Sequence, residues 1–510
     1  MRMRLTTKGK IAILILVIAI IGGLGFIGLK QGWFNFDDVK TKVNNIIPNN
    51  KANKPQEKTN EINLSYDEWI GWKPMLDAQA KGYYDEEGIK VNFSVINDAT
   101  DSSNALISRQ LDAAGYTVNR YAFLMDKFKT NNVEVVMPYI TNYSSGGDGI
   151  IAKSEIKSIN DLVGKKVGVP RFSEAQTLVE WFVNKSDLTD EQKKKINYVY
   201  FDTPDETATA FFAGEIDAAA TWQPYLAQAQ SSTDSHILVD TKNATNLVLD
   251  GIVFRKEFVD TNPDTVEKFI KATLKAIPEY EKDYTALKNN MSLFATMSDE
   301  DIKNTLPDAT LANYNDNIKL LDDEAKILFE DMSNIWLKLG EKAYPDLSKS
   351  AFDSSIIKKL ENEFKTVETK EVKITEEQKQ QVISNTDYEA LLNKQISIEF
   401  KPNSAVFVNQ EEATKVLNEF VNTAKMLNGS IIKVEGNLAN VSGSKASSPE
   451  DIKLTEQRAK TVANYLISQG IDASRFVIVG NGINNQIADN STEEGRKKNR
   501  RTDIKFLLLE

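Results

Sequence analysis

The feature that most constrains this chain is an uncharged apolar run near its N-terminus, residues 11–29, which reads IAILILVIAIIGGLGFIGL. A helix needs roughly 17–25 such residues to cross the hydrocarbon core of a bilayer. A cleavable signal peptide has a shorter apolar region, about 7–15 residues, and a small-residue cleavage site. Lys30, Gln31, Gly32 and Trp33 follow here and supply no such site. The run therefore predicts an uncleaved, single-pass transmembrane helix.

Basic residues set the orientation expected for this helix. The first ten residues contain Arg2, Arg4, Lys8 and Lys10. Positive charge beside a transmembrane helix stays on the cytoplasmic side. We therefore expect a cytoplasmic tail over residues 1–10, with the bulk of the chain on the extracytoplasmic side of the cell membrane. Residues 30–61 are polar and rich in Asn and Lys, which predicts a flexible linker.

Composition limits the chemistry of the extracytoplasmic part. The 510 residues include no Cys and one His, and their net charge is −11. The lack of Cys excludes disulfides, zinc–thiolate sites and cysteine nucleophiles, and His is the commonest general base and metal ligand. General nucleic-acid binding needs a basic face, which an acidic chain does not favour. We therefore expect no enzyme activity, no metal, no cofactor and no nucleic-acid partner.

Strand and helix patterns alternate from residue 62 onwards. Short apolar stretches predict strands at 62–66, 89–96, 112–117 and 133–140, with helices at 74–81, 102–110 and 120–129 between them. Gly82 is placed to end the first of these helices. Alternation at this spacing is typical of βαβ units and mostly parallel sheets. Residues 62–364 are therefore expected to form an α/β domain.

Two segments of this region resemble each other. SRQLDAAGYTVNRY (108–121) and AGEIDAAATWQPYL (213–226) both place Asp-Ala-Ala between a helix end and polar or aromatic residues. The tripeptide can recur by chance, but two similar lobes that face each other explain the echo better. Ligands of open α/β sheets bind beyond the carboxyl ends of the strands. The echo thus predicts ligand contacts at Tyr116, Thr117, Thr221 and Trp222, of which Trp222 is the foremost candidate.

Three longer stretches carry a family resemblance: YDEWIGWKPMLDAQAKGYYDEEGIKVNF, SGGDGIIAKSEIKSINDLVGKKVGVP and GEIDAAATWQPYL. The motifs in these stretches and their order along the chain resemble those of the solute-binding proteins of ABC importers, of the nitrate, sulfonate/taurine and thiamine-precursor type. The resemblance implies a type II periplasmic-binding-protein fold, in which two α/β lobes close on a ligand by hinge motion. It places lobe one at 62–150 and 248–364 and lobe two at 151–247. The crossings between lobes are expected near Gly149–Ala152 and Leu249–Val253.

The same resemblance adds candidates in the cleft. Trp69 and Trp72 follow the first strand, and either line the cleft or form a structural aromatic cap. Ser144, Ser145 and Asp148 belong to a Gly-rich loop at the crossover. The glycines suit a hinge turn, whereas the serine hydroxyls and N–H groups suit an anion.

Three further candidates stand at strand ends. Arg171 and Ser173 follow the strand KVGVP. Arg171 could pair with an anionic group of a ligand or be a solvated loop charge. Asp250 stands near the return crossing, where it could meet a cation or pair structurally.

A smaller domain is expected over residues 395–510, after a charged, helix-favouring spacer at 365–394. A strand running into a loop at 396–407 is followed by a helix at 411–427 and a strand at 431–438. Ser448-Pro449-Glu450-Asp451 then signals a helix start. That helix runs to Gln469, before a third strand at 475–482, a basic turn and a final strand. The expected order is β-α-β-α-β-β.

Motifs in this domain resemble the peptidoglycan-associating domain of the OmpA-like family: EFKPNSAVF, KVEG, KLTEQRAKTVANYLISQGIDASRF and IADNSTEEGRKKNRRTDIKF. The resemblance implies that an Asp after the second strand and a helix Arg grip diaminopimelate of the peptidoglycan stem peptide. The Arg is present as Arg458, but Ala439 occupies the Asp position. Asp451 either supplies the missing carboxylate or only caps the helix. Asn499 and Arg500 are expected to support the fold and the site.

Together these features predict a membrane-anchored, extracytoplasmic solute-binding protein that also associates with peptidoglycan. The resemblance implies a small anionic or heterocyclic metabolite as ligand and an ABC permease as partner. The alternative is a cell-envelope scaffold or sensor whose binding-protein domain no longer serves transport. An enzyme acting on peptidoglycan has no catalytic constellation in the sequence to support it.

Overall fold

The structure is a computed structural model of the 510-residue chain, and it describes residues 57–242, 244–365, 374–384, 392–396, 398–441 and 443–507. The expected transmembrane helix at 11–29, the tail before it and most of the linker lie outside these ranges, as does part of the spacer. No helix within the described ranges is long and apolar enough to cross a membrane.

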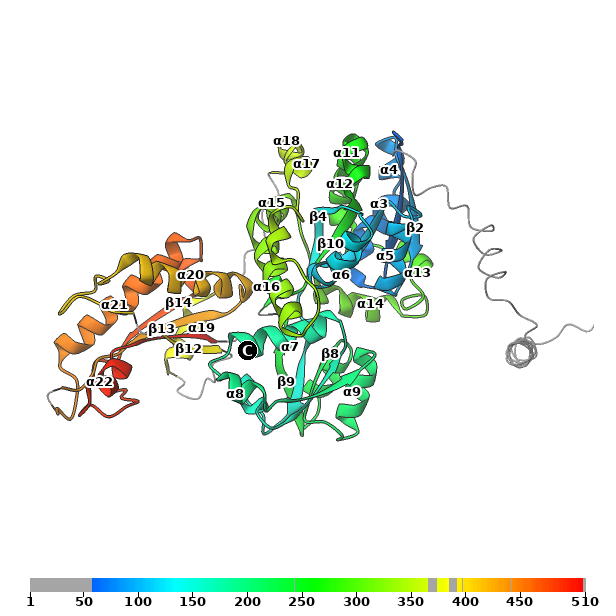
Figure 1. The fold of residues 1–510 in the computed structure, drawn as a ribbon. Helices are drawn as coiled ribbons and strands as arrows, with labels where there is room; N and C mark the ends of the chain where they lie inside the picture. The colour runs from blue at the N-terminus through cyan, green and yellow to red at the C-terminus, as the bar shows by residue number, and fades with distance from the viewer. Residues whose placement is uncertain are drawn as a thin grey trace, which may run out of the picture. The chain divides into compact units, whose positions relative to one another are not determined.

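The first lobe is built on a mixed six-stranded sheet with the order β11-β4-β10-β3-β1-β2 (Figure 1). β1 is parallel to β2 and β3, whereas β10 is antiparallel to β3 and β4. The strands are β1 (Glu61–Tyr66), β2 (Lys90–Val95), β3 (Ala113–Thr117), β4 (Val135–Ser144), β10 (Leu249–Arg255) and β11 (Ala309–Leu311). Buried Ile62 and Leu64 alternate with Asn63 along β1, which anchors this sheet in the core.

Helices surround this sheet in both parts of the first lobe. In the N-terminal part they are α3 (Lys73–Ala80), α4 (Tyr83–Glu86), α5 (Ala99–Ile107) and α6 (Val118–Thr130). After β10 come α11 (Lys256–Thr261), α12 (Pro263–Ala276), α13 (Thr285–Asn290), α14 (Asp299–Thr305), α15 (Tyr314–Lys319), α16 (Ala325–Lys338), α17 (Ser355–Lys358) and α18 (Glu361–Phe364). Gly82 has a left-handed φ of 75° directly after α3, as the helix-stop prediction required.

The second lobe carries a five-stranded sheet with the order β7-β6-β8-β5-β9. β6 is parallel to β7 and β8, and β5 is antiparallel to β8 and β9. Its strands are β5 (Asp148–Lys153), β6 (Lys166–Pro170), β7 (Asn197–Phe201), β8 (Ala218–Trp222) and β9 (Ser235–Asp240). Its helices are α7 (Glu174–Lys185), α8 (Asp190–Lys193), α9 (Pro204–Phe212) and α10 (Tyr225–Gln230).

The two lobes repeat one design, as the internal echo predicted. β3 and β8 occupy equivalent positions, each next to the antiparallel strand of its sheet. The Asp that precedes each strand has the same role: Asp112 Oδ2 accepts the Asn63 amide at 2.9 Å, and Asp217 Oδ2 accepts the Lys166 amide at 3.0 Å. The Asp of Asp-Ala-Ala therefore links β3 to β1 in the first lobe and β8 to β6 in the second.

The sheets are less uniformly parallel than the alternating pattern predicted. β5 and β10, which carry the chain between lobes, run antiparallel to their neighbours. β4 continues to Ser144, beyond the strand end expected at residue 140. The change of sheet occurs between β4 and β5, so it precedes the boundary expected at residue 150.

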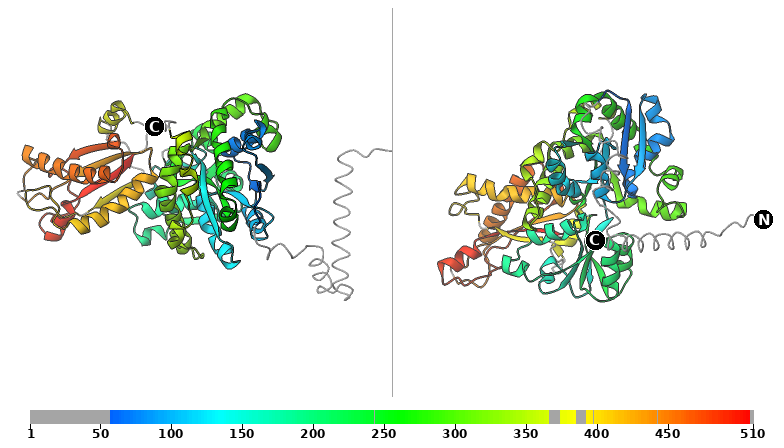
Figure 2. Two further views of the ribbon diagram at one scale, coloured as in Figure 1. Left: turned by 90° about the horizontal axis from the view of Figure 1, so that it is seen from above. Right: turned by 45° about the vertical axis from the view of Figure 1, so that its right-hand side comes forward.

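The C-terminal domain has a four-stranded sheet with the order β12-β15-β13-β14. Its elements are β12 (Leu392–Ile396), α20 (Gln410–Met426), β13 (Ile431–Gly436), α21 (Pro449–Ser468), β14 (Phe476–Gly480), α22 (Glu493–Asn499) and β15 (Thr502–Leu507), and α19 (Glu376–Ser384) precedes them. α20 and α21, gold and orange in Figures 1 and 2, pack against each other. α21 comes very close to the sheet: a Cβ on Gly436 would lie 2.2 Å from the Thr455 carbonyl oxygen.

Two predictions for this domain need correction. A strand running into a loop was expected at 396–407, but the strand is β12, at 392–396, and residues 398–408 form the loop. Pro402 and the left-handed Asn403, with φ of 51°, turn this loop back so that Lys401 N donates to Val406 O at 2.9 Å. The expected basic turn contains a short helix, α22, capped by Thr492. The order is therefore β-α-β-α-β-α-β.

Candidate ligand-binding sites

Two tryptophans follow β1 at the carboxyl edge of the first sheet, and they have different roles. Trp72 is 1% exposed, and its indole Nε1 donates to Asp67 Oδ1 at 2.6 Å. A Cβ on Gly115 would lie 2.9 Å from the Trp72 ring, so the ring packs directly on β3. Trp72 is thus the structural cap of the two alternatives that the sequence left open.

Trp69 is half-buried and lies nearer to the junction between lobes. Its Nε1 donates to Asn142 Oδ1 at 2.9 Å. A Cβ on Gly147 would lie 2.6 Å from the Trp69 ring, so this ring rests on the segment that links β4 to β5. Gly147 is therefore required by close packing, whereas the left-handed turn, with φ of 105°, lies at Gly146.

Asp250 stands on β10 at the same edge. The strand register places it opposite Thr117 of β3 and Asn142 of β4. Asp250 is 3% exposed and forms no ion pair with any residue the structure describes. Thr117 caps α6 by accepting the Arg120 amide at 3.0 Å, and the Tyr116 hydroxyl bonds Ser102 Oγ at 2.7 Å. The buried carboxyl group of Asp250 thus has no partner of opposite charge within ion-pair distance among the described residues.

The segment between β4 and β5 is held by a buried hydroxyl pair. Ser144 Oγ and Thr241 Oγ1 are 2.8 Å apart, and Thr241 Oγ1 also accepts the Gly146 amide at 2.9 Å. The Ser145 amide donates to the Asp308 carbonyl at 2.7 Å. Ser144 is fully buried, so it fixes the crossover and its hydroxyl does not face solvent.

The second lobe presents the start of α7 to this edge. Ser173 caps α7 by accepting the Gln176 amide at 3.1 Å, and it donates to the Pro170 carbonyl at 2.7 Å. The neighbouring Glu174 carboxylate lies 3.7 Å from the Arg120 guanidinium of α6, so an ion pair links the two lobes here. Arg171 is exposed, with its guanidinium 4.5 Å from the centre of the Tyr200 ring. Arg171, which the sequence proposed as a ligand contact, thus packs on the Tyr200 ring of its own lobe.

Trp222 ends β8 directly opposite Asp148 of β5. It is 38% exposed, and its Nε1 donates to Asp205 Oδ1 at 3.1 Å. Thr221 is fully buried and donates to the Pro204 carbonyl at 3.1 Å. The register thus brings an exposed indole and a buried carboxyl group to the same end of the second sheet.

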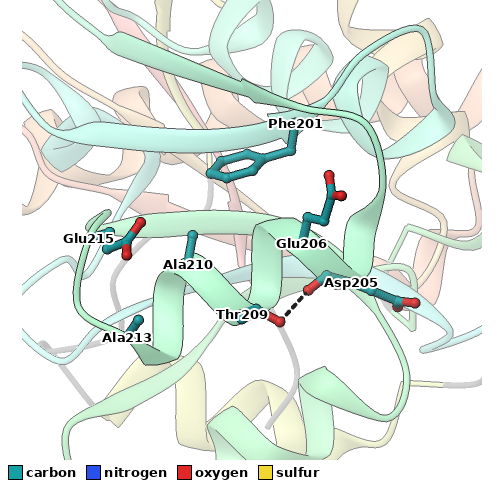
Figure 3. A pocket seen from close by; sticks show the side chains of 7 residues that line it. All are labelled: Phe201, Asp205, Glu206, Thr209, Ala210, Ala213 and Glu215. Atoms are coloured by element: carbon teal, nitrogen blue, oxygen red, sulfur yellow. Dashed lines mark hydrogen bonds between the residues drawn. The ribbon is translucent and has the colours of Figure 1, made fainter.

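A separate surface pocket of about 380 Å³ lies beside α9 in the second lobe, lined by Phe201, Asp205, Glu206, Thr209, Ala210, Ala213 and Glu215. Figure 3 shows the Thr209 hydroxyl bonded to the Asp205 carbonyl, while the Glu206 and Glu215 carboxylates project from the helix and the turn after it. Two of its residues contact the candidates above: Asp205 accepts from Trp222, and the Phe201 carbonyl accepts from the Arg171 amide at 3.0 Å.

Electrostatics at the facing edges are acidic. Burial raises the pKa of Asp67, although Trp72 and the Trp69 amide donate to it. Burial, followed by the charge of Glu174, raises the pKa of Asp148 to about 7. Burial, then the charges of Asp67, Asp148 and Glu174, raise the pKa of Asp250 well above its usual range. The charges of these carboxyl groups therefore raise one another's pKa values. The charge of Arg120 acts in the other direction and lowers the pKa of Asp67.

Sequence reasoning missed Asp67, Glu174 and Asn142. Asp67 directly follows β1, and Glu174 opens α7, so both stand at carboxyl ends of parallel strands. That position was the available signal for both of them. No motif points to Asn142, because its placement depends on β4 extending past the predicted strand end.

The C-terminal domain contains a pocket of about 550 Å³ beside α21. Its lining includes Arg458 and Asp451 of α21, Ala439 after β13, Phe400 of the 398–408 loop, and Arg500. The Arg458 guanidinium lies 5.0 Å from the centre of the Phe400 ring, and its Nε donates to the Ser404 carbonyl at 2.9 Å. Burial, and then the nearby charge of Arg500, lower the pKa of Arg458.

The other two predicted residues differ in role. Asn499 is fully buried, accepts the Ile487 and Ala488 amides at 2.8 and 3.0 Å, and donates to the Ala488 carbonyl at 2.8 Å. It therefore supports the fold. Arg500 lines the pocket and forms an ion pair with Glu493.

Asp451 forms the capping box that the sequence signalled. Its Oδ2 accepts the Ser448 amide at 3.1 Å, and its own amide donates to Ser448 Oγ at 3.1 Å. The side chain lines the pocket while it caps the helix.

Comparison with known proteins identifies both parts of the chain. Residues 70–283 match the family described as NMT1/THI5 like, and residues 399–500 match the OmpA family. The putative aliphatic sulfonates-binding protein of Bacillus subtilis is 25% identical over 283 residues, which cover 51% of this chain and 78% of that protein. The periplasmic aliphatic sulphonate binding protein SsuA of Escherichia coli has 16% identity and a TM-score of 0.45, covering 56% of this chain and 96% of that one.

Relatives of the C-terminal domain are larger proteins of which it covers a part. Outer membrane protein A of Bordetella avium is 36% identical over 96 residues, 19% of this chain and 47% of that protein. The peptidoglycan-binding protein ArfA of Mycobacterium bovis is 37% identical over 90 residues, 18% of this chain and 26% of that protein. The chain thus spans less than half the length of these relatives.

The fold and the sites define a two-lobed α/β binding protein of the type II periplasmic class, followed by a small α/β domain. More specifically, the chain joins an NMT1/THI5-like periplasmic-binding domain to a C-terminal OmpA-family domain, as the sequence motifs implied. The Bacillus subtilis relative of the larger domain is named as a binding protein.

Proposed function

We propose that this chain is a membrane-anchored, extracytoplasmic receptor that binds a small organic solute between its two lobes and peptidoglycan through its OmpA domain. The solute-binding part is supported by the residues at the ends of the two sheets, where the β4–β5 and β9–β10 connections join the lobes. Trp69, Asp67 and Asp250 stand at the carboxyl edge of one sheet, and Trp222 opposite Asp148 at the end of the other. Ligands of such folds bind at this position.

The charge of these residues favours a ligand with a cationic group. Asp67, Asp148 and Asp250 form no ion pair with any described residue, and Glu174 adds a further carboxylate beside them. A buried carboxyl group that lacks a partner is costly to ionise, and an ammonium, amidinium or protonated heterocycle would supply one. Indole rings such as those of Trp69 and Trp222 also attract cations and flat heterocycles. Of the anionic and heterocyclic metabolites that the sequence suggested, a heterocyclic one with a cationic group therefore fits these side chains better.

Anchoring and location are part of the proposal. The apolar run at 11–29 and the basic residues before it support a single-pass helix with a cytoplasmic N-terminus. The receptor would then stand between the membrane and the cell wall, with an ABC permease as its partner in transport.

The proposal is tested with the full chain in detergent micelles, by thermal shift at pH 7.5. The panel contrasts cations (choline, putrescine, benzamidine and thiamine) with anions (nitrate, sulfate and taurine) at equal ionic strength. We expect cations to raise the melting temperature and anions to leave it unchanged. A shift by anions alone would refute the cationic ligand, and no shift with any compound would favour the envelope scaffold or sensor.

Membrane fractionation and permease capture test the remaining parts. The full chain should sediment with membranes and a chain lacking residues 1–30 should not. Co-purification of an ABC permease supports a role in transport, and its absence under conditions that preserve a known receptor–permease pair supports the scaffold.

A further inference from the structure

The chain passes between the two lobes a second time through the connection from β9 to β10. This connection contains a short 3₁₀ helix, η3 (Thr245–Leu247), whose residues are all buried. The Leu247 carbonyl accepts the Asn119 side-chain amide of α6 at 3.2 Å, and the same amide donates to Thr177 of α7 at 2.9 Å. Hinge motions are absorbed by a few residues of such connections. η3 is therefore placed where a movement of the second lobe against the first must be absorbed.

The C-terminal end of α20 in the OmpA domain contacts this connection directly. Both domains belong to the compact part of the chain that begins at Glu57. The Asn246 side-chain amide of η3 donates to the Lys425 carbonyl in the last turn of α20 at 2.9 Å, and Thr245 Oγ1 donates to Asn428 Oδ1 at 2.9 Å. Asn246 and Thr245 are 2% and 8% exposed. Both hydrogen bonds thus involve buried side chains of the hinge connection.

The last turn of α20 depends on donors from outside the helix. A helix leaves its last four carbonyl groups without intrahelical donors. The buried Arg475 guanidinium donates to the Ala424 and Leu427 carbonyls at 2.8 and 2.6 Å. The donor for the Lys425 carbonyl comes from the other domain, because it is Asn246 of η3. The hinge connection therefore completes the end of a helix in the OmpA domain.

An ion pair lies beside these hydrogen bonds. η6 (Leu320–Glu324) is a single π-helical turn between α15 and α16 of the first lobe, and turns of this kind are frequent at functional sites. Asp323 Oδ2 of this turn lies 2.5 Å from Lys425 Nζ, and the buried Glu324 carboxylate accepts the Asn246 side-chain amide at 2.9 Å. The first lobe, the hinge connection and α20 therefore meet at the side chain of Asn246.

We propose that the OmpA domain acts on the solute-binding domain through this contact: the C-terminal end of α20 holds η3 in the conformation described and so restricts movement of the second lobe against the first. Release of α20 would change the balance between open and closed lobes and hence the affinity for a solute between them. Solute binding would in turn change the stability of the contact, because such coupling is reciprocal. The consequence for affinity rests on the proposed solute site, whereas the contact itself does not.

The test measures the distance between the two lobes in the full chain in detergent micelles, by electron spin resonance of two attached labels. Lys303→Cys in α14 and Lys194→Cys at the end of α8 place one label on each lobe, both at exposed positions. The sequence contains no Cys, so no other position is labelled. The measurement needs no ligand, so it does not depend on knowing the solute.

The variant Lys425→Glu places a carboxylate opposite Asp323 and Glu324. Like charges that face each other at an interface shift an equilibrium by about tenfold or more, so a second lobe–lobe distance should gain about tenfold in its ratio to the first. Lys415→Glu makes the same change of charge at an exposed position of α20, and this matched control should leave the distances unchanged. Combining Lys425→Glu with Asp323→Lys restores a pair of opposite charges and should restore the original distances.

Asn428→Ala is a second variant that introduces no charge. It removes the acceptor of Thr245 and should shift the ratio of distances in the same direction by about fivefold, the size of one hydrogen bond. The inference is overturned if the distances are unchanged in Lys425→Glu, if Lys415→Glu changes them equally, or if the exchanged pair does not restore them. If Lys425→Glu loses the circular dichroism of the folded protein, Asn428→Ala decides alone, and unchanged distances there overturn the inference.

The thermal-shift panel reports solute binding separately. If the exchanged pair restores the distances but no compound raises the melting temperature, α20 holds the hinge and the proposed solute binding fails. If compounds bind but Lys425→Glu leaves the lobe distances unchanged, the proposed solute binding stands and the hinge contact fails.

Discussion

Asp67, Asp148 and Asp250 in the periplasmic-binding domain are carboxyl groups without an ion-pair partner, and Arg458 in the OmpA domain is a guanidinium without one, among the residues described. Two other buried cations of the periplasmic-binding domain are neutralised: Lys73 Nζ lies 2.6 Å from Asp77, and the Arg255 guanidinium lies 2.5 Å from Asp112. Both regions therefore contain charged groups without an ion-pair partner. These groups are acidic in the periplasmic-binding domain and basic in the OmpA domain.

The difference has a physical consequence. A buried charge without a partner costs stability, so its presence in a folded domain is most simply explained by a ligand that supplies the partner. The acidic edges would favour a cation and the basic pocket a carboxylate. One chain would thus hold two ligands of opposite charge without competition between the two sites.

The largest effect is expected at Arg458. Replacing it with Ala removes the oriented guanidinium, so binding to sacculi should weaken by at least about thirtyfold, or about 2 kcal/mol. Lys453→Ala, an exposed change on the same helix, is the matched control and should leave sedimentation unchanged. If both variants lose sacculus binding equally, or if Arg458→Ala loses none, Arg458 does not bind the wall and the contrast between an acidic site and a basic site fails. Binding of the cationic solute should be unaffected in either variant.

Asp250→Asn should weaken binding of the cation identified by thermal shift by about tenfold or more, because a carboxylate is replaced by a neutral amide. Isothermal titration measures this loss. Glu155→Gln removes an exposed carboxylate from the second lobe and serves as the control. Retained affinity in Asp250→Asn would show that the ligand does not contact this edge of the first sheet.

The pH dependence should distinguish the sites further. The pKa of Asp148 is raised to about 7, so below that pH the group is largely protonated and attracts a cation less. Affinity for the cation should rise about three- to tenfold from pH 6 to pH 7, with release of a proton, whereas sacculus binding through arginine should stay constant. Titration in buffers of different ionisation enthalpy detects the proton, and a pH-independent affinity would contradict the role of Asp148.

Stability without ligand should change in the opposite direction. Carboxyl groups whose pKa is raised on folding, such as Asp148 and Asp308 at about 7, bind protons more tightly in the folded state. The free energy of unfolding should therefore fall as the pH rises from about 4 to about 7. Chemical denaturation of the ligand-free protein measures this, and the bound cation should diminish the fall.

The smallest effect is expected at Trp222. Trp222→Ala removes an exposed indole from the second lobe and should weaken cation binding by about fivefold, or about 1 kcal/mol. Trp222→Phe retains an aromatic face and should lose less. A larger loss than that of Asp250→Asn would transfer the main contribution from the carboxyl groups of the first lobe to the aromatic face of the second.

Local chemistry made much of the fold predictable. Ser448 and Asp451 cap α21 as the Ser-Pro-Glu-Asp signal required, because both hydrogen bonds join residues three apart. The Asp-Ala-Ala echo likewise identified β3 and β8, although the Asp112 and Asp217 carboxylates accept from the Asn63 and Lys166 amides, which lie 49 and 51 residues away in the sequence. The family motifs are also short stretches of sequence, so they could be recognised without the structure and they identified both domains.

Site residues were predictable in position but not in role. Trp69 and Trp72 are three residues apart, yet one indole is buried against Gly115 and the other rests on Gly147. Asn499 was grouped with Arg500, but it is fully buried and holds the 487–490 loop while Arg500 lines the pocket. Which side chain faces a core and which faces a pocket depends on neighbours that are distant in sequence.

The sequence by itself determined the two domains, their order and the helix and strand boundaries set by caps and turns, because these depend on contacts within a few residues. The tertiary structure decided the charge of each site. Asp67, Asp148, Asp250 and Glu174 come from four separate elements, and their pKa shifts depend on shared burial. Arg458 meets Phe400 and Ser404 only through folding of the 398–408 loop against α21. Electrostatic coupling acts through space, so a linear pattern could not contain it.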